Sequence, residues 1–342
     1  MGRAFAIAAV LALLGLGIAA HAAITMDTVT VGDPGNAGEL SGLGAGGYGP
    51  DRICGSVGYN YNIGKYEVTA GQYTAFLNAK AATDTYALYN PGMSNTSYGS
   101  GITQNGDSGS YTYSVASDWA NRPVNLVSYW DSCRFANWLG NGQGAGSTET
   151  GAYTLNGYNG DDGRTIQRNA GWTWAVTSED EWYKAAYYKG GGPNAGYWEY
   201  PTSSDTAPGQ DMADVSGNNA NYYTYPYAYP IDSGKYTTVA GEFQNSDSPY
   251  GTFDQGGNVF EWNETIGYQD ATYAPRCLRG GSFAFGGGGL QASSRSYYDF
   301  PPTGEGASIG FRVSEVVPEP SSFMVLGSGV LALAGLIRRR RR

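Results

Sequence analysis

The chain has 342 residues, of which 53 are glycine and 29 tyrosine, with 41% hydrophobic and 15% charged side chains. This hydrophobic fraction excludes a disordered chain, and glycine without a three-residue period excludes collagen. The formal charge of −10 argues against nucleic acid and anionic lipid as partners, because like charges repel. The length predicts one large domain or two modest ones, and the composition favours a loop-rich exported protein.

The N-terminus has the three parts of a secretory signal. Arg3 precedes an apolar run over residues 4–20, and Ala20-His21-Ala22 matches the small-residue cleavage pattern. We therefore expect a signal peptide at residues 1–22, with a retained membrane anchor as the alternative. His21 is the only histidine, so the mature chain is expected to contain none.

A chain without histidine lacks Ser-His-Asp and Cys-His catalysis as well as His-ligated zinc. Two carboxylate pairs, Asp161–Asp162 and Glu179–Glu181, have the residue types of a glycosidase. The first pair lies in a turn, and helix capping explains Glu181. We therefore favour structural roles for both pairs.

Three helices are predicted, each behind a hydroxyl residue that can cap it. The cap residues are Thr69, Ser128 and Ser178, and the helical patterns follow over residues 70–82, 129–140 and 179–189. Glu181 completes a capping box with Ser178, and Gly190–Gly192 should end that helix.

Short strands are predicted within residues 29–36, 61–69 and 278–285, and residues 86–121 are predicted as a long loop. Helices among many short strands favour an α+β class over a parallel βαβ sheet. The large aromatics should form the core, including Trp130, Trp138, Trp182 and Trp262. Export allows one disulfide among Cys54, Cys133 and Cys277, and their pairing stays open.

The C-terminus has Pro318-Glu319-Pro320, an apolar stretch over residues 323–337 and the arginines 338–342. This order resembles the PEP-CTERM sorting signal, with an ordinary C-terminal anchor as the alternative. The resemblance implies that residues 318–342 are processed by an exosortase. It also implies export across the inner membrane to the cell surface or extracellular matrix of a Gram-negative bacterium, with membrane contact only through this tail.

Six motifs occur in series between residues 63 and 313: IGKYEVTAGQYTAFLN, RPVNLVSYWDSCRFANWL, TSEDEWYKAAYY, YGTFDQGGNVFEWNE, LRGGSF and IGFRV. Together they resemble the formylglycine-generating enzyme, or sulfatase-modifying factor, domain family. The resemblance implies one domain over residues 23–317. It also implies a modified C-type lectin-like fold of the α+β class, rich in loops, with few short helices and strands and bound calcium.

A glycine-rich turn between two carboxylates presents the hard oxygen ligands that suit calcium. The resemblance implies one calcium site at Asp254, Gly257, Val259 and Glu261. A second would use Asn221, Tyr222, Asp232 and Gly234. The alternative is that Asp254 and Glu261 cap turns and pair with arginines such as Arg279.

The enzymes of this family bind copper through two cysteines that follow the GGS motif. Here those positions are Phe285 and Leu290, and a lone thiol cannot hold copper between two thiolates. Copper and the oxidase reaction are therefore not expected. The same region would line a ligand groove at Arg279, Ser282 and Arg295.

These observations favour an exported, calcium-stabilised binding or structural module without catalysis, with extracellular polysaccharide or a surface protein as its partner. Two alternatives stay open. One is an enzyme of divergent chemistry in the same groove, and the other is a matrix lectin that binds glycans.

Overall fold

A computed structural model of the chain describes residues 23–224, 231–267, 269–271, 273–295 and 300–317. The expected signal peptide (1–22) and sorting segment (318–342) lie outside the described residues. Within the described part, no helix has the length and apolarity needed to cross a bilayer.

Three α-helices begin at the hydroxyl residues expected to cap them: α1 (Ala70–Lys80), α2 (Tyr129–Gly140) and α3 (Glu179–Tyr187). Each has a full capping box, in which the cap oxygen and the side chain three residues later each accept the other's backbone N–H. This exchange satisfies two amides that a helix start leaves open. Helix α3 ends before Gly190, because Tyr188 is extended and pairs with Tyr197.

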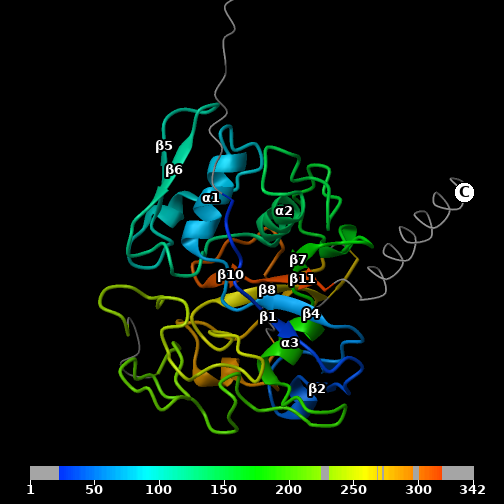
Figure 1. Ribbon diagram of the computed structural model, residues 1–342. Helices are drawn as coiled ribbons and strands as arrows, with labels where there is room; N and C mark the ends of the chain where they lie inside the picture. Colours follow the sequence, from blue (N-terminus) through cyan, green and yellow to red (C-terminus); the bar gives the residue numbers. More distant parts are fainter. Residues whose placement is uncertain (1–22, 225–230, 268, 272, 296–299, 318–342) are drawn as a thin grey trace, which may run out of the picture.

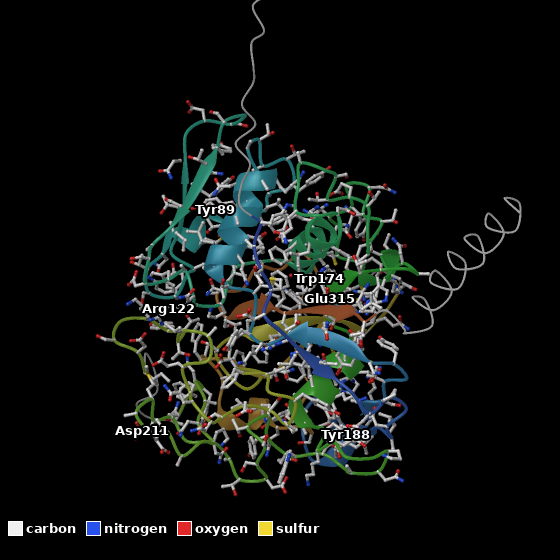
Figure 2. The ribbon with its side chains drawn as sticks, in the orientation of Figure 1. Tyr89, Arg122, Trp174, Tyr188, Asp211 and Glu315 are labelled. Carbon is white, nitrogen blue, oxygen red and sulfur yellow. The ribbon has the colours of Figure 1, made fainter. Side chains whose placement is uncertain are left out.

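A four-stranded antiparallel sheet has the order β1 (Thr28–Val31), β4 (Tyr61–Gly64), β11 (Val313–Val316), β7 (Trp174–Val176). Strand β11 lies in its interior, with Ser314 opposite both Ile63 and Ala175. Trp174 and Glu315 face each other across β7 and β11, and Figure 2 shows them together. Residues from the two ends of the described chain therefore share one sheet.

The second sheet has the order β10 (Ile309–Phe311), β8 (Phe260–Ile266), β9 (Arg276–Arg279), with β10 parallel and β9 antiparallel to β8. In Figure 1, α1 and α2 lie on one side of the central strands and α3 on the other. Helix α2 contacts β7 and β8, whereas α3 contacts β4 and β8.

Two hairpins complete the strands: β2 (Glu39–Ser41) with β3 (Arg52–Cys54), and β5 (Ile102–Asn105) with β6 (Thr112–Val115). Short 3-10 turns occur at Leu43–Ala45, Pro91–Ser94, Gly163–Thr165 and Gly287–Leu290. The prediction of a loop over residues 86–121 was therefore wrong in part, because the second hairpin lies within it.

The core is rich in aromatic residues, as expected. Trp130, Trp182 and Trp262 are fully buried and Trp138 nearly so. The ring N–H of Trp262 donates to the Val127 carbonyl at 3.0 Å, and that of Trp130 donates to the Gly160 carbonyl at 2.9 Å. Cys54, Cys133 and Cys277 are all buried free thiols, so the structure contains no disulfide among them.

Candidate functional site

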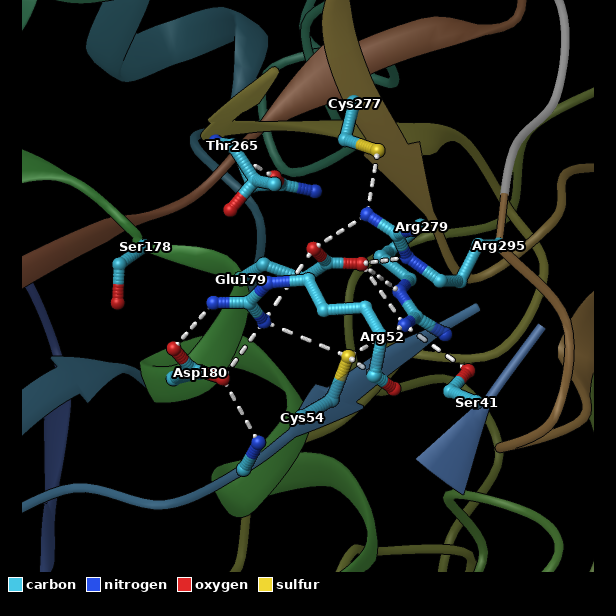
Figure 3. A network of polar contacts seen from close by, with 12 residues as sticks. Ser41, Arg52, Cys54, Ser178, Glu179, Asp180, Thr265, Cys277, Arg279 and Arg295 are labelled. Atoms are coloured by element: carbon cyan, nitrogen blue, oxygen red, sulfur yellow. Dashed lines mark hydrogen bonds and ion pairs between the residues drawn. The ribbon is translucent and has the colours of Figure 1, made fainter. Parts of the chain in front are cut away.

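The carboxylate of Glu179, at the start of α3, is the centre of a buried ion network (Figure 3). Arg295 donates to it from Nε at 2.7 Å and from Nη2 at 2.8 Å. Arg279 Nε donates at 2.9 Å, and Arg52 lies at 3.5 Å. Burial alone would raise the pKa of Glu179, but the three guanidinium groups outweigh it and lower the pKa to about 2.

The remaining donors of these arginines are also occupied. Arg279 Nη1 donates to the Ser294 carbonyl at 2.7 Å, and its Nη2 lies 3.2 Å from the Cys54 sulfur. Arg295 Nη1 donates to the Pro50 carbonyl at 2.6 Å, and its Nη2 lies 3.5 Å from the Cys277 sulfur. The two arginines predicted for a ligand groove therefore direct their guanidinium groups into the protein.

A cavity of about 320 Å³ does lie at the expected groove, lined by Tyr48, Phe260, Arg279, Phe285, Ser294 and Arg295 together with four glycines. Ser282, also predicted there, is fully buried and does not line the cavity. The Phe285 ring packs edge-on against Phe260 at 4.8 Å between centroids. Leu290 is fully buried. Apolar side chains therefore occupy both positions at which the family's enzymes have cysteines.

The two carboxylate pairs are held in structural roles, as favoured. Asp162 caps the Gly163–Thr165 turn and pairs with Arg164 at 2.8 Å. Glu181 closes the capping box of α3 and pairs with Arg168 at 2.8 Å. Neither pair presents two free carboxyl groups to a shared cavity.

Glu261 belongs to a second fully buried ion pair. Arg312 donates to its two oxygens from Nε and Nη2, both at 2.7 Å, and the ring N–H of Trp182 donates at 2.8 Å. Glu261 therefore does pair with an arginine, but the partner is Arg312 and not Arg279. These three hydrogen bonds leave one of the roughly four acceptor positions of the carboxylate unused.

The turn before Glu261 is formed by residues in the left-handed region of backbone space. Asp254, Gly257 and Asn258 all have positive φ, at 60°, 88° and 56°. Asp254 Oδ2 accepts the Gly241 N–H at 2.6 Å, and burial raises the pKa of Asp254 to about 6. A Cβ at Gly257 would lie 2.2 Å from the Asn221 carbonyl oxygen, so only glycine fits there.

The residues predicted for the second calcium site bind different partners within the protein. Asn221 is nearly fully buried, and its Oδ1 atom has no hydrogen-bond partner. The Tyr222 carbonyl instead accepts from Gln210, and Asp232 pairs with Arg122. Gly234 lies in a turn with φ of 74°. Among the described residues, Asn221 Oδ1 is thus a buried acceptor without a donor, whereas Asp232 is committed to an arginine.

The sequence analysis missed Glu67, which follows β4. Its side chain is only 1% exposed, and neither carboxylate oxygen has a hydrogen-bond partner. Burial raises its pKa, and the nearby carboxylates Asp254 and Glu261 raise it further. The motif YEVT could have suggested it, because a charged residue between apolar strand positions faces inward or marks a site. Among the described residues, no group of three or more Asp, Glu, His and Cys side chains could alone hold a metal.

Comparison with known proteins places this chain in a family. Residues 56–316 match the sulfatase-modifying factor enzyme 1-like domain, and residues 316–342 match the PEP-CTERM protein-sorting motif. No curated protein matches the sequence significantly. The sorting motif indicates an exported protein that is associated with the surface or exterior of a Gram-negative cell.

Among solved structures, CarF is similar at 20% identity and a TM-score of 0.52, over 86% of this chain and 99% of its own. Treponema denticola variable protein 1 has 17% identity and a TM-score of 0.49, over 86% and 96% of the two chains. PvdO from Pseudomonas aeruginosa has 19% identity and a TM-score of 0.45, over 85% and 92%. The similarity to CarF confirms the expected α+β, C-type lectin-like fold. Because the family model matches well over half of its length, the chain belongs to the sulfatase-modifying factor enzyme 1-like family.

Proposed function

We propose that this protein is an exported binding or structural module that carries out no oxidase reaction at its groove. One observation carries the proposal: Phe285 and Leu290 stand where the family's enzymes have their copper-binding cysteines. Cu(I) requires soft thiolate ligands, and the Cys54 and Cys277 thiols are buried against arginines. The described residues that line the groove include no carboxylate and no thiol, which also disfavours a divergent acid–base enzyme.

The oxidase test is direct. The purified protein is incubated with copper and a cysteine-containing sulfatase peptide, and the peptide is analysed by mass spectrometry. An active formylglycine-generating enzyme serves as the positive control. We expect the cysteine of the peptide to remain unchanged, and its conversion to formylglycine would refute the proposal.

We propose further that calcium stabilises the module. The ion would be held by the Asp254 carboxylate, the Gly257 and Val259 carbonyls and the one remaining acceptor position of Glu261. The buried Asn221 Oδ1 atom without a partner supports a cation near the second set. A ligand that binds only the folded state raises the melting temperature. Chelator should therefore lower the melting temperature, and added calcium should restore it. A melting temperature that changes with neither addition would refute the role of calcium.

A glycan-binding role is the second candidate, and Tyr48 favours it. This side chain is 62% exposed and lines the cavity beside Phe285. An exposed aromatic ring at a pocket of this size is typical of a binding surface. Binding on a glycan array that is lost in Tyr48→Ala would support this role, whereas equal binding by that variant would exclude the cavity as the glycan site.

A further inference from the structure

Glu67 is a buried carboxylate with no counter-charge of its own. It follows the end of β4, where the carbonyls of Gly64 and Lys65 accept hydrogen bonds from Arg312 Nη1. Arg312 is nevertheless committed to Glu261 through two bonds of 2.7 Å. No ion pair among the described residues includes Glu67, and both of its oxygens lack a hydrogen-bond partner. A buried ion left in this state is strongly unfavourable.

Glu67 lies beside Asp254. The Phe253 amide, one residue before Asp254, donates to the Lys65 carbonyl at 2.8 Å. Gly241, which donates to Asp254, follows Val239 and Ala240, which line the same cavity as Glu67. Glu67 also interacts electrostatically with both Asp254 and Glu261. Arg312 is bound to Glu261 through two hydrogen bonds, so neither Glu67 nor Asp254 has an arginine of its own among the described residues. A divalent cation would hold both side chains in the ionised form.

The cavity in front of Glu67 gives an ion access from solvent. It has a volume of about 480 Å³, and its lining includes Thr25, Asp27, Tyr66, Gln72 and Asn121. A cavity of this size and polarity has room for the water molecules that calcium retains. Glu67 is thus an unpartnered carboxylate that lines this cavity.

We propose that Glu67 is a cation-binding carboxylate of the calcium site at Asp254, and that the ion enters through the cavity that Glu67 lines. This inference rests on the calcium-stabilised module proposed above and adds a residue that neither the motif nor the family match assigns. It also predicts that Glu67 destabilises the protein when calcium is absent and stabilises it when calcium is bound.

The test compares Glu67→Gln with the unaltered full chain by calorimetric titration with calcium chloride and by melting with and without chelator. Glu242→Gln is the matched control, because Glu242 also interacts with Asp254 but does not line the cavity. We expect Glu67→Gln to weaken calcium binding at least tenfold, and Glu242→Gln to change it less than threefold. In chelator, Glu67→Gln should melt at or above the unaltered chain, and in calcium below it. Glu67→Asp, which keeps the charge, should recover part of the affinity.

Three outcomes would overturn the inference. Unchanged calcium affinity in Glu67→Gln would remove Glu67 from the site while leaving the calcium response of the unaltered chain, and the proposed function, intact. A lower melting temperature of Glu67→Gln in chelator would show that Glu67 has a structural partner and not an ion. Failure of the unaltered chain to bind calcium would instead refute the calcium site itself, and this inference with it.

Discussion

Replacement of Glu179 by glutamine tests whether the buried arginine network stabilises the fold. The substitution keeps the shape of the side chain and removes its charge. Arg279 and Arg295 would remain buried, at 1% and 3% exposure, without the carboxylate that accepts from both. Arg52 would lose only part of its environment, because Asp180 also binds it at 2.6 Å.

Two estimates of the cost agree. Removal of one partner from a buried ion pair typically destabilises a protein by about 3–5 kcal/mol. The pKa of Glu179 falls from the ordinary 4.5 to about 2, which corresponds to about 3 kcal/mol at about 1.4 kcal/mol for each pH unit. We therefore expect Glu179→Gln to lower the free energy of unfolding at pH 7 by about 3–5 kcal/mol.

The sign of the pH dependence follows from the lowered pKa. The folded state holds Glu179 ionised, so its contribution is fully present above pH 4.5 and is lost as the pH falls towards 2. Urea unfolding across this range should show the difference between the unaltered chain and Glu179→Gln shrinking with acid. Asp180→Asn is the control, because that carboxylate also binds Arg52 but is 27% exposed, and its loss should cost about 1 kcal/mol or less. A cost for Glu179→Gln no larger than that of the control would refute the reasoning.

Three further predictions concern local features. Ser178→Ala removes the cap of α3, whose oxygen accepts the Glu181 amide at 3.1 Å, and should cost about 1 kcal/mol in urea unfolding; no loss would mean that water replaces the cap. Gly257→Ala places a methyl group 2.2 Å from the Asn221 carbonyl at a φ of 88° and should cost about 3 kcal/mol, whereas Gly58→Ala, with open space around it, should be near neutral. The three thiols are buried and free, and burial raises the pKa of Cys277 to about 12, so a thiol reagent at pH 8 should label them only in denaturant; rapid labelling of the native protein would contradict this burial.

The helices were predictable because their signals are local. Thr69, Ser128 and Ser178 each lie three residues before the residue with which they exchange hydrogen bonds, so a short stretch of sequence contains the whole interaction. The hairpin within residues 86–121 escaped prediction although Thr112–Val115 alternates polar with apolar residues, because each of its strands has only 4 residues and lies in a segment rich in Ser, Gly and Asn. Its turn residues resemble those of an ordinary loop.

The ion networks were not predictable in the same way. Glu179 takes its partners from segments at least 100 residues away on either side, and no local spacing reports such contacts. The motif around Asp254 correctly indicated a glycine-rich turn, but Arg312 was not identified as the partner of Glu261. Glu67 was overlooked because its distinguishing property is the lack of a partner, which only the packed structure reveals.

The position of β11 also bears on when the four-stranded sheet can form. This strand lies between β4 and β7, yet it is the last strand of the described chain and runs directly into the sorting motif that begins at residue 316. Strands β4 and β7 both pair with β11 and not with each other, so they cannot be joined in one sheet until residues 313–316 have been made. The sheet is therefore complete only in a chain that already carries the first residue of the sorting motif.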